Sequence, residues 1–304
     1  MAKRKSGLDI NGILLLDKAT GVSSNHALQR VRRLFNANKA GHTGSLDPLA
    51  TGLLPLCFGE ATKVSGMMLD DDKRYRVSIR LGTMTDTGDL EGQVISEMAV
   101  PQLSQSLIES AITQFLGPID QVPPMYSALK HQGKKLYELA RQGQVIERPA
   151  RPVIIHAIQL QGFDAGTLYL DVSCSKGTYI RSLAEDLSHA LGTCGTVSSL
   201  RRTEAGCFKL DQAITLEDLL NLSESDRLER LLPVDLPLQF MPAITIDQPQ
   251  AQSIQQGQAI AVTSDLSGSV RIYADHCFLG LGEMSKNGKL SPKRIFNLSE
   301  HHSD

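Results

Sequence analysis

The segment from Arg74 to Leu81 alternates regularly between polar and apolar side chains, and this pattern limits what the chain can fold into. The two sets are Tyr75, Val77, Ile79 and Leu81 against Arg74, Arg76, Ser78 and Arg80. Successive side chains of a β-strand point to opposite faces, so the pattern predicts a strand over residues 73–81 with one face in a core. Such a strand needs partner strands and a covering layer, which the rest of the chain must supply.

Strands and helices are both predicted elsewhere in the chain, in an irregular order. Apolar segments of strand length occupy residues 12–17, 153–160, 167–174, 197–201 and 206–210. Helices are predicted from the cap candidates at residues 23–25 to about Phe35, over residues 107–115 and 134–142, and over residues 178–191 with Thr178 as the cap. Because these elements do not follow a regular strand–helix–strand alternation, we predict an α+β fold.

The texture of the sequence changes after Leu236 and Pro237. A small helix is predicted over residues 249–256, and short strands separated by turns rich in Asp, Gly and Asn are predicted over residues 270–273, 278–283 and 293–297. We therefore expect two domains, a large one over residues 1–242 and a small β-rich one over residues 243–304.

The composition is that of a globular chain with a core. Of the 304 residues, 41% are hydrophobic and 21% are charged. No stretch reaches the roughly 18 apolar residues of a membrane helix, and no apolar signal segment follows the basic N-terminus, so we expect a cytoplasmic protein. The five cysteines are odd in number and form no CxxC pair, which argues against disulfides and against a zinc site.

The formal net charge of −2 hides an uneven distribution of charged residues. Residues 130–151 contain six Lys or Arg residues against two Glu, whereas residues 211–247 contain eight acidic residues against two Arg. A balanced total is compatible with a basic face that binds nucleic acid, and on charge alone it is equally compatible with a solvated helix surface.

The segment from Gly41 to Gly52 concentrates glycine, proline and reactive side chains, including His42, Asp47 and three hydroxyl groups. Glycine and proline permit unusual turns, and polar groups held there are either solvated or used. An ordinary turn in which Asp47 caps backbone N–H groups fits these residues as well. The lysine of a Walker loop is missing, the G-x-S-x-G pattern is absent at Ser45, and His42 and Asp47 lack the further ligands of a metal site.

Three other short segments combine aromatic, basic and apolar side chains. Arg181 follows a predicted strand-to-helix junction, and arginine is a suitable fixed partner for a carboxylate such as Asp47, with a surface contact as the alternative. Tyr75 lies between arginines, where base stacking and ordinary strand packing are both compatible with it. The run Ser199-Leu-Arg-Arg202 by itself indicates a strand end with solvated arginines.

Taken in order, these segments resemble the TruB family of bacterial tRNA pseudouridine-55 synthases. The resemblance rests on nine segments in the family's order: 11–18, 40–55, 59–63, 72–76, 82–88, 124–130, 133–137, 174–181 and 200–202. The residues after 202 match the family only in size and texture. Ser45 departs from the alanine that many relatives have at this position.

The resemblance implies a pseudouridine synthase fold, with a mixed, largely antiparallel sheet and a central RNA-binding cleft, followed by a small PUA-like RNA-binding domain. It implies a reaction at uridine 55 in the T loop of tRNA, in which the C1′–N1 bond breaks and the same ring is rejoined through C5. This isomerisation needs no redox change and no external energy source, so no cofactor and no metal are expected.

The resemblance also implies roles for single residues. Asp47 would be the catalytic carboxylate, acting as a nucleophile or as the base that removes the C2′ proton. Arg181 would pair with Asp47 and hold it ionised, because an opposite charge lowers the pKa of a carboxylate. Tyr75 would stack on the uracil and is a candidate base for the C5 proton, with Leu200 on the other face and Tyr179 hydrogen-bonding in the pocket.

Contacts with the RNA follow from the same resemblance. The target uridine must be flipped out of the folded T loop, and His42 would occupy the space that it leaves. The basic segment 124–151 would be a thumb-like insertion that clamps the T arm through its phosphates. The remaining implied RNA-binding residues are Lys63, Lys130, Lys134, Lys135, Arg141, Arg201 and Arg202.

Three other functions are compatible with the same residues. The catalytic subunit of an RNA-guided pseudouridylase shares the Asp motif, but such proteins lack the insertion at 124–151 and use partner proteins. A non-catalytic RNA-binding or RNA-folding factor would use the same cleft, and a hydrolase would release free uracil. We expect a monomer that acts on the tRNA T stem-loop without an obligate protein partner.

Overall fold

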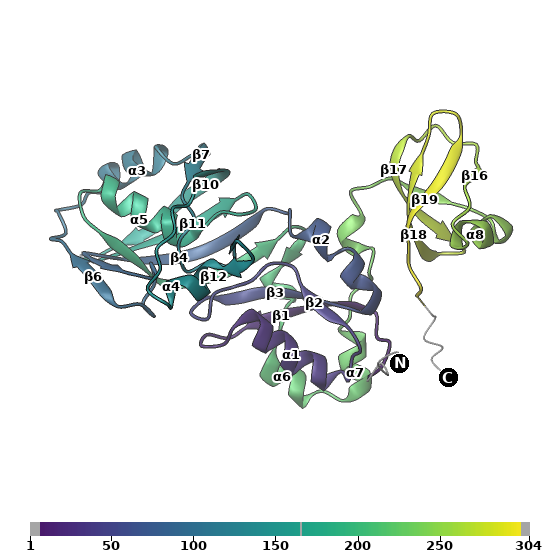
Figure 1. The fold of residues 1–304 in the computed structure, drawn as a ribbon, viewed down its shortest axis with the longest axis horizontal. Coiled ribbons are helices and arrows are strands. Elements are labelled where there is room, and N and C mark those ends of the chain that lie inside the picture. Colours follow the sequence, from purple (N-terminus) through teal and green to yellow (C-terminus); the bar gives the residue numbers. More distant parts are fainter. Residues whose placement is uncertain (1–6, 165, 299–304) are drawn as a thin grey trace.

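A computed structural model describes residues 7–164 and 166–298, and it shows a large body joined to a smaller C-terminal one (Figure 1). The outermost residues of the two predicted domains, 1–6 and 299–304, lie outside the described residues.

The large body is built on one ten-stranded sheet. Its strands, in spatial order, are β14 (Ile214–Thr215), β1 (Gly12–Lys18), β3 (Thr51–Phe58), β12 (Gly195–Ala205), β4 (Lys73–Leu81), β11 (Thr167–Cys174), β10 (Arg151–Phe163) and β7 (Gly117–Gln121), with β2 (Ala40–His42) on β3 and β13 (Phe208–Lys209) on β12.

The sheet is mixed and largely antiparallel, as predicted. Only the pairs β1–β14 and β3–β12 are parallel, whereas β4 is antiparallel to both of its neighbours, β11 and β12. Strand β4 has the predicted bounds, and Val77, Ile79 and Leu81 are buried on one face of it. The α+β class is therefore confirmed.

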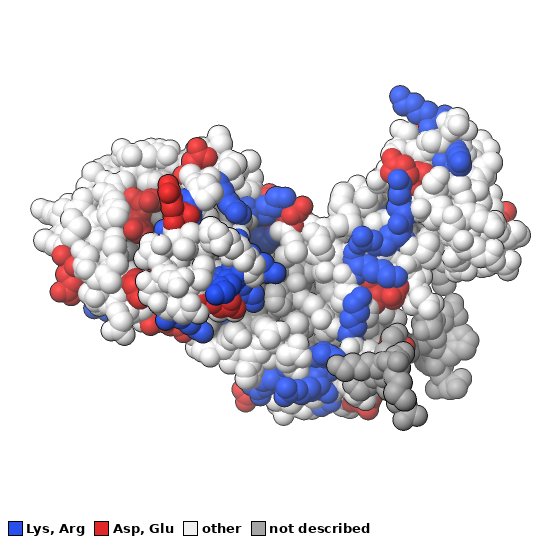
Figure 2. All heavy atoms as spheres, in the orientation of Figure 1, with Lys and Arg blue, Asp and Glu red and all other residues white. Residues whose placement is uncertain are grey.

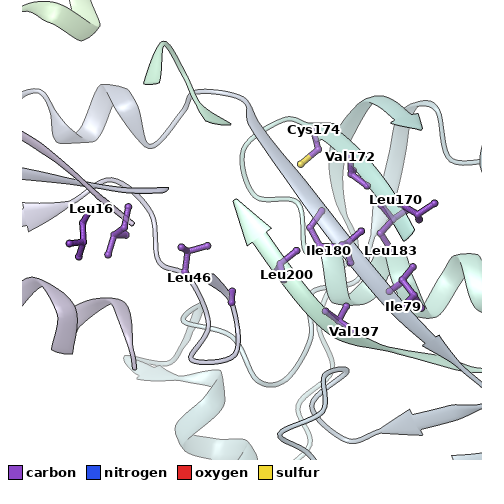
Figure 3. Close-up of a cluster of buried hydrophobic side chains, with 14 of the residues drawn as sticks. Leu16, Leu46, Ile79, Leu170, Val172, Cys174, Ile180, Leu183, Val197 and Leu200 are labelled. Carbon is purple, nitrogen blue, oxygen red and sulfur yellow. The ribbon is translucent and has the colours of Figure 1, made fainter. Parts of the chain in front are cut away.

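Three helices lie against the sheet, namely α1 (Ser24–Leu34), α3 (Gln105–Thr113) and α5 (Ile180–Ala190). Apolar residues of all three belong to the same core as the inner face of β4. Figure 3 shows part of this core, in which Ile180 and Leu183 of α5 lie with Ile79 and Leu170 of the sheet. One face of the sheet is therefore covered by helices.

Strand β1 is apolar on both faces because it contributes to two cores. Leu14 and Leu16 belong to the core that α1 covers. Ile13 and Leu15 belong to a second core on the other side of the strand, which also includes Phe278 of the C-terminal body. A strand that is buried on both faces needs apolar side chains on both of them, so its sequence is a continuous apolar run.

Two of the predicted helices differ from the structure. The N-cap residue of α5 is Tyr179, whose side chain makes no capping hydrogen bond, and the Thr178 hydroxyl instead donates to the Ser175 carbonyl at 2.9 Å. The cap assigned to Thr178 was therefore wrong. The helix predicted over residues 134–142 is limited to α4 (Leu136–Ala140), because residues 134–135 form β9 (Lys134–Lys135), a short hairpin partner of β8 (Lys130–His131).

Shorter elements complete the large body. Strands β5 (Thr83–Thr85) and β6 (Val94–Glu97) form a hairpin, and β6 lies at the left edge of the large body in Figure 1. The remaining elements are η1 (Gly59–Lys63), α2 (Ser65–Met68), η2 (Leu210–Gln212), α6 (Leu216–Asn221), α7 (Glu224–Glu229) and η3 (Leu236–Leu238).

The C-terminal body contains a five-stranded sheet and one helix, which confirms the predicted small β-rich unit. The strand order is β15 (Ala243–Thr245), β17 (Gly268–Ala274), β18 (Cys277–Met284), β19 (Lys289–Ile295) and β16 (Ile260–Ala261), with α8 (Gln248–Gln255) packed beside β19. Strand β19 begins four residues before the predicted residue 293. Ile254, Val270, Ile272 and Leu290 are fully buried in a core of its own.

The two bodies are joined by apolar packing and by polar contacts. Phe278, Leu281 and Phe296 share a core with residues of the large body. The Lys63 ammonium donates to the Ile295 carbonyl at 2.8 Å, and the Tyr273 hydroxyl donates to Asp235 at 2.5 Å. In the described part of the chain, the helices are too short or too polar to cross a membrane.

Candidate active site

Asp47 lies in the loop that connects β2 to β3, and its closest charged partner comes from a distant helix. Oδ2 of Asp47 is 2.9 Å from Nη2 of Arg181, which belongs to the first turn of α5. The predicted pairing of these two residues is therefore present. The Asp47 side chain keeps 42% of its surface accessible, whereas that of Arg181 keeps 6%. A carboxylate that faces a cleft is thus held from behind by a buried cation.

Glycine at the end of this loop is required by a close approach between two strands. Gly52 has a φ of +100°, and a Cβ added there would lie 2.3 Å from the Arg202 carbonyl oxygen. This approach is where β3 and β12 pair in parallel, with Gly52 opposite Arg202. The start of β3 can contact β12 only without a side chain, so Gly52 places the Asp47 loop beside the centre of the sheet.

Arg202 is buried beneath this loop and does not face solvent. It is 1% exposed, its Nε donates to the Leu53 carbonyl at 2.7 Å, and its Nη2 donates to the Gly44 carbonyl at 3.2 Å. The prediction that Arg202 contacts RNA phosphates is therefore wrong, because its guanidinium is enclosed and already bonded. Arg202 supports the start of the Asp47 loop from below.

Arg181 also links two other segments around Asp47. Its Nη1 donates to the Thr87 carbonyl at 2.7 Å, and its Nη2 donates to the Tyr126 carbonyl at 2.8 Å. Asp89, which is 4% exposed, lies 3.8 Å from Nη1 and accepts a hydrogen bond from the Thr87 hydroxyl at 2.7 Å. The planar guanidinium therefore holds Asp47 in a fixed direction.

The pKa of Asp47 is raised above its ordinary value, although Arg181 lowers it as predicted. Burial is the largest cause and disfavours the ionised form. Arg181 and Lys18 act in the opposite direction, while the neighbouring charge of Asp89 adds to the rise. The cation is present as predicted, but it only partly offsets desolvation.

Tyr75 and Leu200 lie on the inner face of the sheet, on adjacent strands. Tyr75 of β4 is opposite Arg202, and Leu200 of β12 is opposite Val77. Leu200 is 8% exposed and belongs to the core of Figure 3, against which Tyr75 packs. The pKa of the Tyr75 hydroxyl is raised, mainly by burial, so it is a phenol at neutral pH.

Tyr179 immediately precedes α5 and is held by its backbone. Its N–H donates to Oε1 of Gln121 at 2.7 Å, and its carbonyl accepts from Nε2 of Gln121 at 3.0 Å. Burial raises the pKa of its half-buried phenol. The charge of Asp47 acts on both phenols, so Tyr75 of β4 and Tyr179 before α5 lie near Asp47, but neither is among the residues that line the cleft in front of it.

His42 ends β2, opposite Leu56 of β3. Its pKa is lowered, first by burial and then by the nearby charge of Arg202, so the imidazole is neutral at neutral pH. Its Nδ1 atom is buried and has no hydrogen-bond partner among residues 7–164 and 166–298.

A cleft of about 820 Å³ opens in front of Asp47. The Asp47 loop, the start of α1, the segment 86–93 and the segment 126–141 form its walls. Its charged lining is mixed in sign and consists of Asp47, Asp86, Asp89, Glu91, Lys135, Arg141 and Arg181. The Tyr126 hydroxyl bonds to Asp86 at 3.2 Å, so the predicted insertion forms one side of the cleft.

The other predicted RNA-binding residues fall into two groups. Lys130, Lys134 and Arg141 are exposed, and Lys135 lines the cleft. By contrast, Arg201 donates twice to Asp17, at 2.6 and 3.1 Å, and Lys63 is bonded to Glu60 at 2.5 Å and to the C-terminal body. In the first group, the Lys135 ammonium and the Arg141 guanidinium lie 5.4 and 5.5 Å from the centre of the Tyr137 ring, at the surface, whereas the second group is bonded to carboxylates.

Figure 2 shows a line of Lys and Arg side chains that runs from the C-terminal body, across its junction with the large body, to the lower edge of the molecule at α1. Arg30 and Arg33 of α1 are exposed, as are Lys293 and Arg294 of β19. This line lies outside the basic segment 130–151 that the sequence singled out.

Two charged residues at the site had no role in the sequence analysis. Asp89 follows the quoted segment 82–88 directly, and its acidic neighbours gave no reason to expect burial. Lys18 is 1% exposed, and its ammonium donates to the carbonyls of Ala19, Val22 and Pro48 at 2.9, 2.7 and 3.4 Å. Burial lowers the pKa of Lys18 to about 8, partly offset by Asp47.

Metal ligands do not cluster at the site. Within residues 7–164 and 166–298, no group of three His, Cys, Asp or Glu side chains is arranged to hold a metal ion. The chemistry available in the cleft lining is that of the Asp47 carboxylate and the Arg181 guanidinium, with the phenols of Tyr75 and Tyr179 behind that lining.

Solved structures with the same fold are known. A Cbf5–Nop10–Gar1 complex contains a chain that matches 93% of this chain with a TM-score of 0.70 and 23% identity. A chain from an H/ACA RNP bound to a substrate RNA matches 98% of it with a TM-score of 0.71 and 20% identity. This similarity shows the fold of the chain, and the family model that matches residues 32–180 gives its class, that of the pseudouridine synthases.

Sequence relatives define the family within that class. Residues 32–180 match the N-terminal domain of the TruB family pseudouridylate synthases, residues 181–239 match the tRNA pseudouridylate synthase B C-terminal domain, and residues 242–296 match the C-terminal domain of pseudouridine synthase II TruB. The chain therefore belongs to the TruB family. The tRNA pseudouridine synthase B of Chromohalobacter salexigens is 51% identical over 98% of both chains, and that of Dechloromonas aromatica is 47% identical over 99% of this chain and 100% of its own.

Proposed function

We propose that this chain isomerises uridine 55 in the T loop of tRNA to pseudouridine, with Asp47 as the catalytic carboxylate. The observation that carries this proposal is the Asp47–Arg181 pair, which holds a partly exposed carboxylate at the floor of a cleft. The full-length similarity to tRNA pseudouridine synthases B supports the substrate class.

The target uridine is flipped out of the T loop and enters the site, at a cost of a few kcal/mol for unstacking. Tyr75 stacks on one face of the uracil, and Leu200 contacts the other face. The raised pKa of Tyr75 keeps it protonated, which favours stacking over removal of the C5 proton. His42, as a neutral ring, fills the space that the base leaves in the RNA.

Asp47 then initiates cleavage of the C1′–N1 bond, as a nucleophile or as the base for the C2′ proton. The uracil rotates, C5 bonds to C1′, and the proton on C5 is lost. Arg181 favours the ionised form of Asp47 against the opposing effect of burial. No atom is added or removed overall, because N1 gains the proton that C5 loses.

The RNA is held outside the cleft by basic side chains. The insertion 124–151 contacts the T arm through Lys130, Lys134, Lys135 and Arg141, which are exposed or line the cleft. The C-terminal residues 243–304 act as a PUA-like RNA-binding domain, separate from the catalytic residues 1–242. The line of cations across their junction supports this assignment, because phosphates bind cations.

The chain acts alone in this proposal. The alternative, the catalytic subunit of an RNA-guided enzyme, shares the fold with the Cbf5 complex, but at 23% identity this similarity speaks only for the fold. The insertion on the cleft wall and the relatives with 47–51% identity favour the stand-alone enzyme.

The test uses the purified full-length chain and a T stem-loop RNA with uridine tritiated at C5. Isomerisation at position 55 releases this tritium into water and leaves pseudouridine in the RNA. Product only when a guide RNA and partner proteins are added would favour the alternative enzyme. Release of free uracil would identify a hydrolase, and unmodified but bound RNA would identify a non-catalytic binding factor.

A further inference from the structure

Ser24 makes two hydrogen bonds to the residue that precedes Asp47. Its hydroxyl accepts from the Leu46 N–H at 2.7 Å and donates to the Leu46 carbonyl at 3.0 Å. Ser24 is 2% exposed, so these bonds are shielded from water. One side chain therefore satisfies both backbone groups of a single loop residue.

The usual structural reason for a serine at the start of a helix does not apply to Ser24. The N-cap residue of α1 is Ser23, whose hydroxyl accepts from the His26 N–H at 3.2 Å. Ser24 is the first helical residue, and its side chain points to the Asp47 loop instead of the helix. Its bonds to Leu46 thus contribute to the loop and not to the helix end.

The backbone on the other side of Asp47 is fixed by the same segment of the chain. The Pro48 carbonyl accepts from the Gly21 N–H at 2.8 Å and from the Lys18 ammonium at 3.4 Å. The Thr20 hydroxyl donates to the Leu49 carbonyl at 3.1 Å. Residues 18–24 therefore hold the peptide group before Asp47 and those that follow Pro48 and Leu49, while the Asp47 carbonyl accepts from the Ala50 N–H at 3.1 Å.

The Leu46 side chain adds a third constraint. It is 5% exposed and belongs to the core shown in Figure 3, together with Leu16 and Leu200. The direction of Leu46 is fixed by packing, and its peptide groups are fixed by Ser24. Any rotation of the loop at Asp47 must therefore break a buried hydrogen bond or move a core side chain.

We propose that Ser24 is a positioning residue that sets the direction of the Asp47 carboxylate for the attack on the ribose. The inference deepens the proposed function and rests on it. Ser24 does not touch the reacting atoms; it acts through Leu46. Catalysis depends steeply on such placement, since an error of about 1 Å at a reacting group can lower the rate about 100-fold.

The test compares Ser24→Ala with Ser104→Ala, a substitution that removes the N-cap of α3, at a helix end outside the cleft lining, and leaves both Leu46 bonds. Single-turnover rates are measured per tRNA-binding site, so that unfolded protein does not count. Ser24→Ala is expected to lower the single-turnover rate about 10- to 100-fold with unchanged tRNA affinity. Ser104→Ala is expected to keep the wild-type rate per site, even if it lowers the melting temperature.

Ser24→Cys keeps the shape of the side chain but replaces the hydroxyl by a weak hydrogen-bonding group. It is expected to show the same loss of rate and provides the test if the alanine variant does not fold. Wild-type rates per site in Ser24→Ala or Ser24→Cys would overturn the proposal, as would an equal loss in Ser104→Ala. An inactive wild-type chain would instead overturn the proposed function, so the two failures are distinguishable.

Discussion

The Nη2 atom of Arg181 lies 2.9 Å from the Asp47 carboxylate and 2.8 Å from the Tyr126 carbonyl. One guanidinium thus joins the candidate catalytic residue to the insertion that forms a wall of the cleft. The conformation of the insertion at Tyr126 and the orientation of Asp47 depend on the same buried side chain. Both should therefore change when the Arg181 side chain is removed.

Replacing Arg181 by Met is expected to lower both stability and activity. The change removes a buried cation and leaves Asp89 without its nearest positive charge, and breaking a buried pair in this way costs about 3–5 kcal/mol. Urea denaturation measures the loss, and Arg181→Lys serves as the control that keeps the charge. A stability of Arg181→Met equal to that of the wild type would contradict the structural role.

Burial raises the pKa of Asp47, so the activity should begin to fall at a higher pH than it would with an aspartate of ordinary pKa. The reaction needs the ionised form, so kcat/KM is lost as the pH falls through this raised pKa. In Arg181→Met the pKa of Asp47 should rise further, which moves the acid limb to higher pH. The pH dependence of kcat/KM is measured for the wild type and for Arg181→Met on the same stem-loop. Acid limbs that coincide in the two profiles would refute the predicted shift.

The same shift has a consequence for stability. A raised pKa means that folded Asp47 binds its proton more tightly than the unfolded chain does, so its ionisation costs folding free energy as the pH rises from the unfolded to the folded value. Relative to the wild type, Asp47→Asn should therefore lose less free energy of unfolding at neutral pH than at a pH near the pKa that aspartate has in the unfolded chain. Denaturation curves at several pH values measure this difference.

Arg202 and Arg201 are adjacent in sequence but should respond very differently to substitution. Arg202→Met leaves the Leu53 and Gly44 carbonyls without their donor and should cost about 3 kcal/mol, with loss of activity as the Asp47 loop loosens. Arg201→Met removes a half-exposed ion pair with Asp17, which is worth about 1 kcal/mol or less. Equal melting temperatures of the two variants would show that Arg202 does not support the loop.

Binding of tRNA should depend on salt through the exposed cations of the insertion. Replacing Lys134 or Arg141 by Ala removes a phosphate contact and should lower the slope of log Kd against log salt by about 1 for each contact. Arg230, which is exposed after α7 in the acidic segment 211–247, is the matched control for the insertion. An unchanged slope in Lys134→Ala and Arg141→Ala would exclude the insertion from phosphate binding.

The strands could be predicted from sequence because their patterns depend on local geometry. Strand β4 alternates between a core and solvent, and its predicted bounds agree with the structure. The same alternation could have predicted the burial of Arg202, because it lies two residues after the inward-facing Leu200 on β12. We predicted RNA binding because Arg202 is charged, although its place in the alternation of β12 indicates an inward-facing side chain.

Other features could not be read from a local pattern. The cap assigned to Thr178 failed because its hydroxyl bonds to a carbonyl three residues back, a local competitor of capping. Lys18 ends an apolar strand, and nothing in the sequence shows that three carbonyls from two segments converge on its ammonium. A motif can indicate that Arg181 pairs with Asp47, but it does not indicate how deeply Asp47 is buried. The net rise in the pKa of Asp47 was therefore not predicted.

The role of Asp47 is tested most directly by Asp47→Asn in the full-length chain, assayed for tritium release from the T stem-loop and, in parallel, for tRNA binding. The amide keeps the size of the side chain and can still contact Arg181, but it cannot act as nucleophile or base. We expect tRNA binding to be retained and the rate to fall at least about a thousandfold. Pseudouridine formation at the wild-type rate would contradict the assignment of Asp47 as the catalytic carboxylate.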